Sequence, residues 1–269
     1  MVSVLHVLDI AGVSSILAFY YNKLIDNAEI NYHSKNSVSK TISEFYVGKK
    51  YKKFRDLLIG SFFRSFKFDI IHIHGAEILV PLFKITGKKV VLHYHGSDIN
   101  EEHRSKSKWR ILCRSMSDLI IFNGIEMEKQ IVTIRNVPKK YLSNPVDTNH
   151  FNLKNQKKNG RVSVVSSNLD KEETIEAIQK LGETEIINLD NLQIPYRFMP
   201  NILSKYETYV DIKIMPWGQE LVDLSTTALQ ALACGLKVIH HGKEIKDLPK
   251  EHEPEKVIEK LNQYYKEIM

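Results

Sequence analysis

Residues 224–239 read Leu-Ser-Thr-Thr-Ala-Leu-Gln-Ala-Leu-Ala-Cys-Gly-Leu-Lys-Val-Ile. The stretch begins with hydroxyl side chains, continues through alanine and leucine, and reaches Gly235 before a second apolar run. Hydroxyl residues are preferred at the start of a helix, and glycine readily takes the left-handed conformation that ends one. We therefore predict a helix over 225–233 and a buried strand over 236–240, which is the helix–strand order of an α/β sheet.

The same alternation of strands and helices extends over the rest of the chain. In the first half, we predict strands at 2–8, 29–33, 69–74, 89–94 and 118–122, and helices from Ser14 or Ser15 to about Ile25 and at 49–66, 77–85 and 106–116. In the second half, further strands are predicted at 161–165, 185–189 and 209–214, and further helices at 171–181 and 254–268. Such an alternation predicts open, mostly parallel sheets with helices on both faces.

A polar segment, Lys154-Asn-Gln-Lys-Lys-Asn-Gly, interrupts this alternation. We therefore expect two Rossmann-like domains, at 1–150 and 161–250, joined by a linker at 151–160 and followed by a C-terminal helix at 251–269. Ligands of such folds bind beyond the carboxyl ends of the strands, so the expected site is a cleft between the domains.

The composition excludes several classes of protein. With 43% hydrophobic residues, 26% charged residues, and only 12 glycines and 8 prolines in 269 residues, the chain is neither collagen-like nor disordered. No apolar run approaches the roughly 20 residues of a membrane-spanning helix, and the N-terminus lacks the pattern of a secretory signal. Two distant cysteines, Cys113 and Cys234, exclude a disulfide framework and a four-cysteine zinc site. We therefore expect a cytoplasmic protein.

The basic charge is concentrated in one segment. The net charge is +6, and residues 47–68 alone contain seven basic residues and one acidic residue, together with five of the 11 phenylalanines. A nucleic-acid-binding protein usually spreads its basic residues over a face, so nucleic acid is not expected as a partner. Basic and aromatic residues on the predicted helix 49–66 indicate a helix that binds an anionic membrane surface peripherally. The alternative is a core-packing helix with a solvated basic face.

The start of the helix at 225–233 is a candidate phosphate site. Ser225, Thr226 and Thr227 combine hydroxyl groups with the unpaired N–H groups of a first helical turn, where the helix dipole is positive. The alternative is an ordinary N-cap that only stabilises the helix.

Four segments resemble the motifs of retaining glycosyltransferases of the family 4 type, which have the two-Rossmann GT-B fold. They are Gln230-Ala-Leu-Ala-Cys-Gly-Leu-Lys-Val-Ile, Asp69-Ile-Ile-His-Ile-His-Gly, Val91-Leu-His-Tyr-His-Gly-Ser-Asp-Ile and Asn144-Pro-Val-Asp-Thr-Asn-His-Phe. Together with Gly12 in the first strand–helix loop, they extend the resemblance from residue 1 to about 242. The resemblance implies an acceptor domain at 1–150 and a donor domain at 161–250. It also implies transfer of a sugar from a nucleotide-diphosphate sugar to a glycan or lipid-linked acceptor.

The resemblance also implies roles for individual residues. His95 and Asp98 would position the sugar or the acceptor, and Glu220 would contact the donor sugar. Gln230, where the family has glutamate, would bind the donor ribose. The donor diphosphate would lie against Gly12, the helix start at Ser225, Thr226 and Thr227, and Lys171 or Lys213. No metal and no cofactor other than the donor substrate is expected.

Two other functions remain open at this stage. Gln230 replaces a family glutamate, and the second domain lacks the arginine that the family pairs with a lysine near the leaving diphosphate. Both departures are compatible with a binding or scaffold protein that has lost catalysis. The pairs His72/His74 and His93/His95 each put two imidazoles on one face of a strand, which is how some metal-dependent hydrolases begin a metal site. The spacing from His93 to Asp98 does not fit that pattern, so the hydrolase is the less favoured function.

Overall fold

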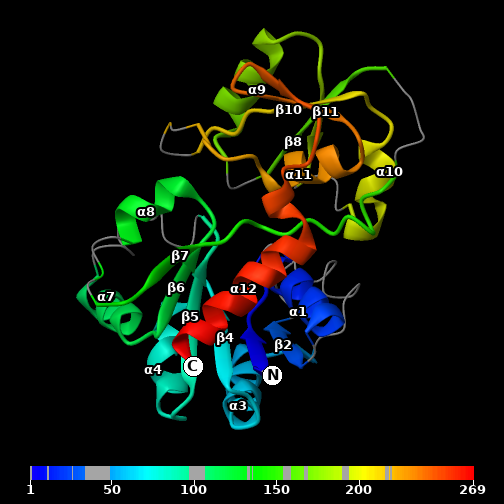
Figure 1. Cartoon of the computed structure of the whole chain (residues 1–269). Coiled ribbons are helices and arrows are strands. Elements are labelled where there is room, and N and C mark those ends of the chain that lie inside the picture. The colour runs from blue at the N-terminus through cyan, green and yellow to red at the C-terminus, as the bar shows by residue number, and fades with distance from the viewer. Residues whose placement is uncertain are drawn as a thin grey trace. The chain divides into compact units, whose positions relative to one another are not determined.

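The chain folds into two units, each built around a mostly or entirely parallel sheet (Figure 1). The first unit comprises Met1–Pro145 and Pro254–Met269, and the second comprises Val146–Glu253. A computed structural model describes the chain except residues 1, 11, 26, 34–48, 97–106, 132, 133, 135, 154–158, 167, 168, 190–193, 216, 217 and 219. The C-terminal helix, expected as a separate element, belongs to the first unit.

The first unit contains a seven-stranded sheet with the strand order β3-β2-β1-β4-β5-β6-β7, in which all neighbours are parallel. Its strands are β1 (Val4–Val7), β2 (Ala28–His33), β3 (Lys49–Tyr51), β4 (Ile70–His74), β5 (Lys89–Tyr94), β6 (Leu119–Phe122) and β7 (Lys139–Tyr141). Its helices are α1 (Val13–Leu24), α3 (Phe54–Ser65), η1 (Glu77–Leu79), α4 (Val80–Lys84), α7 (Lys108–Ser115), α8 (Ile125–Ile131) and α12 (Pro254–Ile268).

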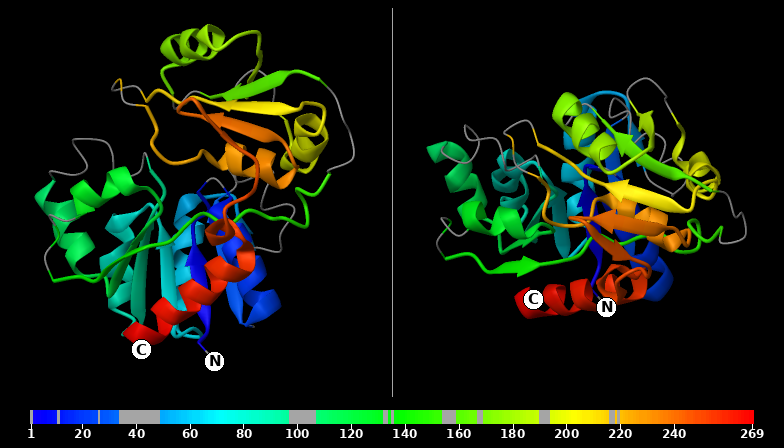
Figure 2. Two further views of the ribbon diagram at one scale, coloured as in Figure 1. Left: turned by 45° about the horizontal axis from the view of Figure 1, so that its top comes forward. Right: turned by 90° about the horizontal axis from the view of Figure 1, so that it is seen from above.

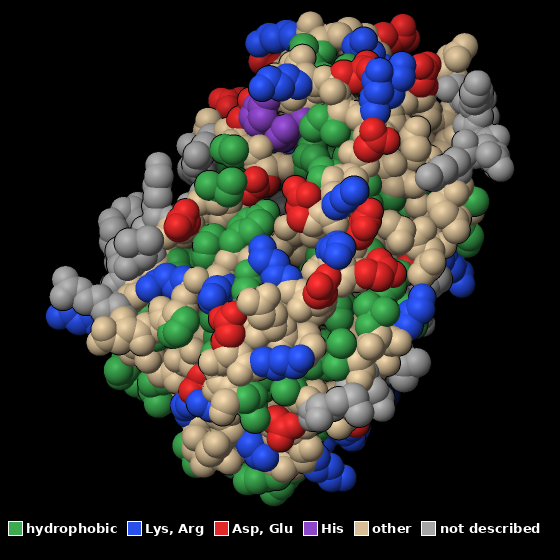
Figure 3. Space-filling model, in the orientation of Figure 1, with side chains coloured by type: hydrophobic (Ala, Val, Ile, Leu, Met, Phe, Trp, Pro, Cys, Tyr) green, Lys and Arg blue, Asp and Glu red, His purple; other side chains and the backbone are tan. Residues whose placement is uncertain are grey.

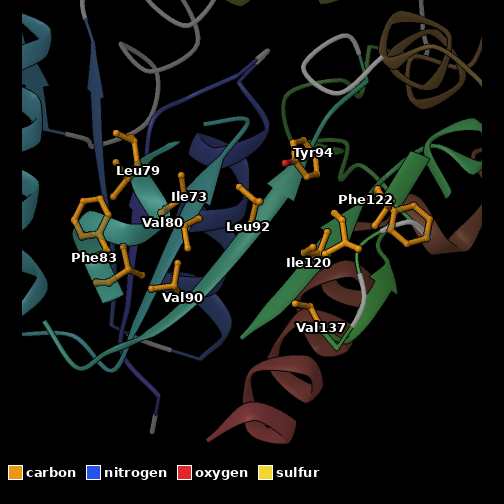
Figure 4. Packing of buried hydrophobic residues seen from close by; sticks show 14 of the residues in the cluster. Ile73, Leu79, Val80, Phe83, Val90, Leu92, Tyr94, Ile120, Phe122 and Val137 are labelled. Carbon is orange, nitrogen blue, oxygen red and sulfur yellow. The ribbon is translucent and has the colours of Figure 1, made fainter. Parts of the chain in front are cut away.

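Helices cover both faces of this sheet (Figures 1 and 2). Side chains alternate along each strand, so Ile71 and Ile73 point to one face of β4 whereas His72 and His74 point to the other. The isoleucines belong to an apolar core with Phe83 of α4 and residues of β5 and β6 (Figure 4). The histidine face is covered by α12, which also packs against α1.

The second unit contains a five-stranded sheet with the order β12-β11-β10-β8-β9, in which only the edge strand β12 is antiparallel. Its strands are β8 (Arg161–Val165), β9 (Glu185–Asn188), β10 (Thr208–Asp211), β11 (Lys237–His240) and β12 (Lys243–Ile245). Its helices are α9 (Lys171–Lys180), η2 (Tyr196–Phe198), α10 (Met199–Leu203), α11 (Thr226–Ala233) and η3 (Lys250–His252). The two sheets confirm the predicted α/β class with mostly parallel strands.

Two predicted helix starts are wrong. The segment 49–66 is not one helix, because Lys49–Tyr51 pairs with β2 as an edge strand and α3 begins only at Phe54. Lysines are common on exposed edge strands, where their charge opposes pairing with another chain. In the first loop, Gly12 is the N-cap of α1, with φ 76°, rather than Ser14 or Ser15. Glycine suits this position, because most other residues avoid a positive φ.

Cys113 and Cys234 are both buried and unpaired. In the described part of the chain, no helix combines the length and apolar character needed to span a bilayer. Figure 3 shows lysine and arginine side chains interspersed with aspartate and glutamate on the face drawn there.

Candidate functional site

Five histidines gather where β1, β4 and β5 end: His6, His72, His74, His93 and His95. The strand register explains the cluster, because it sets His6 opposite His72 and His74 opposite His93. Four of the five are buried, and His95, one residue beyond β5, is partly exposed. The sequence predicted the two pairs, but it did not indicate that His6 joins them.

Hydrogen bonds connect several of these rings. His6 Nδ1 lies 3.0 Å from His74 Nε2, and His74 Nδ1 lies 2.9 Å from His95 Nε2. On the far side of His95, Nδ1 lies 3.3 Å from Asn123 Nδ2, which donates to Asn144 Oδ1 at 2.6 Å. The row therefore crosses from β1 through β4 and β5 to the residue that follows β6.

The cluster is uncharged at neutral pH. Desolvation by burial lowers the pKa of His6 and of His95 to about 3. Burial, and then the neighbouring imidazoles, hold the pKa values of His72, His74 and His93 well below their usual range. A protonated ring in this cluster would lose its hydration and repel its neighbours, so each ring keeps one N–H and one acceptor nitrogen.

Two groups of three histidines could in principle hold a metal ion. The ligand atoms of His6, His72 and His74, and those of His74, His93 and His95, lie within 4.8 Å of one another. However, His72 and His74 are stacked with ring centroids 4.4 Å apart and planes only 14° from parallel. Lone pairs of stacked rings lie side by side, whereas the ligands of one ion direct their lone pairs to a common point. The stacking of His72 and His74 therefore does not suit a metal site in the first of these groups.

The loop between β1 and α1 contains Asp9, which is not among the site residues predicted from the sequence. Its carboxylate accepts a hydrogen bond from Ser15 N at 3.3 Å and another from Ser15 Oγ at 2.6 Å. Burial raises the pKa of Asp9 to about 6, although the bonds from Ser15 and Ser14 oppose the shift. The candidate residue Gly12 lies in the same loop, and the candidate Asp98 lies outside the described residues.

A polar cluster in the second unit surrounds Asp211, the last residue of β10. Ser225 donates its N–H to Asp211 Oδ2 at 3.0 Å and its hydroxyl to Asp211 Oδ1 at 2.6 Å. The same hydroxyl accepts the N–H of Ala228 at 3.2 Å, so Ser225 is the N-cap of α11. The N–H groups of Thr226 and Thr227, which follow in the first turn, have no acceptor within the helix itself.

His240 and Lys213 complete this cluster. His240 Nδ1 lies 3.2 Å from Asp211 Oδ2, and Nε2 lies 2.8 Å from the carbonyl oxygen of Val222. Burial lowers the pKa of His240, but the hydrogen bond to Asp211 and the other acceptors outweigh it and raise the pKa to about 9. Burial would raise the pKa of Asp211, yet His240, Lys213 and Ser225 hold it below its usual value. His240 is therefore an imidazolium paired with a carboxylate at neutral pH.

The candidate Lys213 is buried rather than displayed at the surface. Its Nζ donates to the carbonyl oxygen of Val164 at the end of β8. Burial lowers the pKa of Lys213 to about 8, and the charge of Asp211 opposes that shift. Lys213 thus keeps a positive charge at neutral pH beneath the ends of β8 and β10.

Backbone contacts bring further candidate residues near this cluster. Asp170 N, next to the candidate Lys171, donates to the carbonyl oxygen of Ile214 at 2.8 Å, and Ile214 forms an isolated bridge with Glu220. Glu220 is half-exposed, and its Oε1 lies 3.2 Å from His241 Nδ1. The last candidate, Gln230, is buried in α11. Asp211 and His240 are not among the residues predicted from the sequence. Each is the last residue of its strand in the structure, β10 and β11.

Comparisons with known proteins agree with the motifs. Residues 32–150 match the family model for Glycosyltransferase Family 4, which confirms the family resemblance over this segment. No curated protein sequence matches the chain.

Three similar solved structures share 8–12% sequence identity with the chain. One is UDP-GlcNAc 2-epimerase of Methanocaldococcus jannaschii in complex with UDP-GlcNAc and UDP, at 11% identity and TM-score 0.49, covering 97% of this chain and 92% of that one. Spinosyn rhamnosyltransferase SpnG with thymidine diphosphate has 8% identity and TM-score 0.45, covering 98% and 92%. A Glycosylation Associate Protein complex from Streptococcus agalactiae has 12% identity and TM-score 0.43, covering 84% and 56%. TM-scores below 0.5 are too low to transfer an activity.

Proposed function

We propose that this chain, whose residues 32–150 match Glycosyltransferase Family 4, transfers a sugar from a nucleoside-diphosphate sugar to a glycan or lipid-linked acceptor. The family match is the observation that carries the proposal. The transfer is proposed to retain the configuration at the anomeric carbon, as the resemblance implies. No metal and no further cofactor is part of the proposal.

The diphosphate of the donor is proposed to bind at the start of α11. Cleavage at the anomeric carbon leaves negative charge on the diphosphate, and fixed dipoles and charges that face it lower the barrier. The N–H groups of Thr226 and Thr227 at the positive end of α11 can supply such dipoles. Ser225 has its N–H and hydroxyl directed at Asp211, so its role is to hold this helix start in position. Lys171 and the buried Lys213 add positive charge.

The remaining candidate residues are assigned to the sugar, the ribose and the acceptor. Gln230 is proposed to hydrogen-bond the donor ribose through its amide, and Glu220 is proposed to contact the donor sugar. In the first unit, His95 and Asp98 are proposed to position the sugar or the acceptor, and Gly12 is proposed as a residue that takes part in binding the donor. The neutral state of His95 suits a hydrogen-bonding role toward a sugar hydroxyl.

The acceptor is proposed to be reached at an anionic membrane surface on the cytoplasmic side. Five exposed basic residues lie in β3 and at the start of α3: Lys49, Lys50, Lys52, Lys53 and Arg55. The exposed side chains of Ile59 and Phe63 on α3 and of Phe66 at its C-cap follow the spacing of one helical stripe. Phe63 is 67% exposed, and exposed apolar patches can mark a membrane-interaction surface. The basic residues and the apolar stripe suit headgroups and acyl chains respectively.

A second candidate function is a scaffold that binds a nucleotide sugar or a partner enzyme without catalysis. The observation in its favour is Gln230, an amide where the resemblance expects a carboxylate. An amide can hydrogen-bond a ribose but cannot contribute a negative charge.

A panel of nucleoside diphosphates, followed by a transfer assay, tests both functions. A ligand present at 100 times its Kd stabilises the folded chain by about 2.7 kcal/mol, which a thermal-shift measurement detects. Stabilisation by one diphosphate, together with consumption of the matching nucleotide sugar when acceptor is added, supports the transferase. Stabilisation without any turnover supports the scaffold, and the absence of stabilisation by every diphosphate contradicts both.

A further inference from the structure

The three rings of His6, His74 and His95 lie end to end rather than face to face. The centroids of His74 and His95 are 5.1 Å apart with planes 11° from parallel, while the facing nitrogens are 2.9 Å apart. For His6 and His74 the centroids are 5.3 Å apart and the nitrogens 3.0 Å apart. The centroid separations exceed the N–N distances by about two ring radii, as in-line N–H···N hydrogen bonds require. By contrast, the centroids of His93 and His95 are only 4.2 Å apart, which is too close for an in-line N–H···N hydrogen bond between these two rings.

An uncharged imidazole has one N–H donor and one acceptor nitrogen. In a row of such rings, the direction of one hydrogen bond therefore sets the direction of the next. Asn123 Nδ2 faces His95 Nδ1 at 3.3 Å and donates to Asn144 Oδ1, and an amide nitrogen has two hydrogens to donate. His95 then accepts at Nδ1 and donates from Nε2 to His74, which donates from Nε2 to His6 Nδ1. The row ends at His6 Nε2, which is buried without a hydrogen-bond partner among the described residues.

We propose that His6, His74 and Asn123 are positioning residues that fix the tautomer of His95 through one directional chain of hydrogen bonds. The chain runs from Asn123 through His95 and His74 to His6, with all three histidines protonated on Nε2. The outer end is His95, which is partly exposed, and its Nδ1 is an acceptor. A sugar hydroxyl that replaces the Asn123 amide at this nitrogen donates its hydrogen to it. This role of His95 rests on the proposed transferase function. The direction of the hydrogen bonds does not depend on it.

Asn123 is the residue that sets the direction. If its amide were turned over, the oxygen would face His95 Nδ1, and each ring would have to carry its hydrogen on Nδ1 instead. Replacing Asn123 with leucine removes both the donor and the acceptor and keeps the number and branching of the side-chain heavy atoms. Without either, the two directions compete, and the tautomers of the three rings must change together because each bond depends on the next.

The test is long-range ¹⁵N–¹H NMR of the full chain with ¹⁵N-labelled histidine, without ligand at pH 7. In the wild type, His6, His74 and His95 are expected as Nε2–H tautomers. In Asn123→Leu, their ring ¹⁵N signals are expected to shift in the same direction and by the same fraction. The matched control is Tyr265→Phe, which removes the 2.5 Å hydrogen bond to His72 Nδ1 and leaves the row intact. It should leave the three tautomers unchanged.

Three results would contradict the proposed direction of the hydrogen bonds. They are an Nδ1–H tautomer at any of the three rings in the wild type, unchanged tautomers in Asn123→Leu, or a change confined to His95. Because the measurement uses the unliganded chain, its outcome is independent of whether the chain transfers sugar. If the tautomers behave as expected but no diphosphate binds, the chain of hydrogen bonds stands and only its link to transfer is lost.

Discussion

The carboxylate of Asp211 accepts two hydrogen bonds from Ser225, one from the N–H at 3.0 Å and one from the hydroxyl at 2.6 Å. These bonds fasten the start of α11 to the end of β10. A similar pair joins Asp9 to Ser15 in the first unit, where the carboxylate also follows a buried strand and the serine lies in the first turn of a helix. In each unit, a buried carboxylate thus fixes a helix start near the carboxyl edge of the sheet, where ligands of α/β folds bind.

Ser225→Ala should lower the free energy of unfolding by about 2 kcal/mol, measured by urea denaturation. The variant loses the N-cap acceptor for Ala228 N and the hydroxyl donor to the buried Asp211. Thr226→Ala is the control, because the adjacent residue is not the cap, and its effect should stay within about 0.5 kcal/mol. Equal effects of the two substitutions would mean that the Asp211–Ser225 contact contributes little.

The pairing of His240 with Asp211 predicts a pH-dependent contribution to stability. Burial lowers the pKa of His240. The hydrogen bonds to Asp211 and to the carbonyl oxygen of Val222, with the charge of Asp211, outweigh burial and raise the pKa from 6.5 to about 9. A raised histidine pKa stabilises the fold fully below the unfolded-state value and loses that stabilisation as the pH rises through the folded-state value. The free energy of unfolding of the wild type should therefore exceed that of His240→Gln most at about pH 6. The difference should shrink between pH 7 and pH 10. A difference that is constant over this range would show that His240 is uncharged in the fold.

The proposed phosphate site predicts that Thr226→Pro weakens binding of the nucleoside diphosphate about tenfold or more. Proline at the first position of a helix removes an N–H donor, and a hydrogen bond to a charged group is worth about 1.5–3 kcal/mol. The residue before a proline must be extended, and Ser225 already has φ −64° and ψ 153°, so the fold should tolerate the change. Isothermal titration calorimetry with the nucleoside diphosphate compares the affinity of this variant with that of Thr226→Ala, which keeps the N–H group. Equal affinities of the two variants would show that the start of α11 does not bind the diphosphate.

We predict that metal ions play no part in ligand binding, because the stacked rings of His72 and His74 do not direct their lone pairs to one point. Excess chelator should leave the affinity for nucleoside diphosphate unchanged, and the purified chain should contain zinc at well below one equivalent. His93→Ala is the informative variant, because both of its buried ring nitrogens lack a hydrogen-bond partner among the described residues. Stoichiometric zinc that disappears in this variant would favour the metal-dependent hydrolase instead.

The sequence was most informative where burial alone decides the local structure. The apolar runs of β5 and β8 were predicted with their observed bounds, as was the helix Pro254–Ile268, because a continuous apolar run or a strong 3.6-residue period leaves few alternatives. Short elements such as β7 and α10 were missed, since three to five residues give too few positions for a period to show.

The sequence was least informative where the answer depends on which strands are neighbours. From Tyr51, the aromatic and apolar residues Phe54, Leu58 and Phe62 have a spacing that fits a helix, but pairing with β2 makes Lys49–Tyr51 a strand. His6 and His74 are 68 residues apart, and they meet only because β1 lies next to β4 in the sheet. The contact between Asp211 and Ser225 likewise depends on the position of α11 over the end of β10. Tertiary contacts of this kind have no local signature in a single sequence.

The basic residues of β3 and α3 predict binding to anionic membranes. Lys49, Lys50, Lys52, Lys53 and Arg55 are exposed, and at about 1 kcal/mol each near an anionic surface they supply up to about 5 kcal/mol. Screening over a Debye length of about 8 Å limits this attraction at physiological salt. In a sedimentation assay, the chain should bind vesicles that contain anionic lipid, bind neutral vesicles little, and be released at high salt.

Replacing the four lysines of this segment with glutamine should abolish vesicle binding and leave the affinity for soluble nucleotide unchanged, because the proposed donor site lies in the second unit. The matched control replaces four exposed lysines elsewhere, Lys180, Lys243, Lys246 and Lys250, which changes the net charge equally. Phe63→Ser should weaken binding without altering its salt dependence, because it removes only apolar contact. Loss of binding in both lysine variants would indicate a response to net charge alone. Absence of binding by the wild type at low salt would leave a partner-docking or core-packing role for this segment and would remove the lipid-linked acceptor from the proposed function.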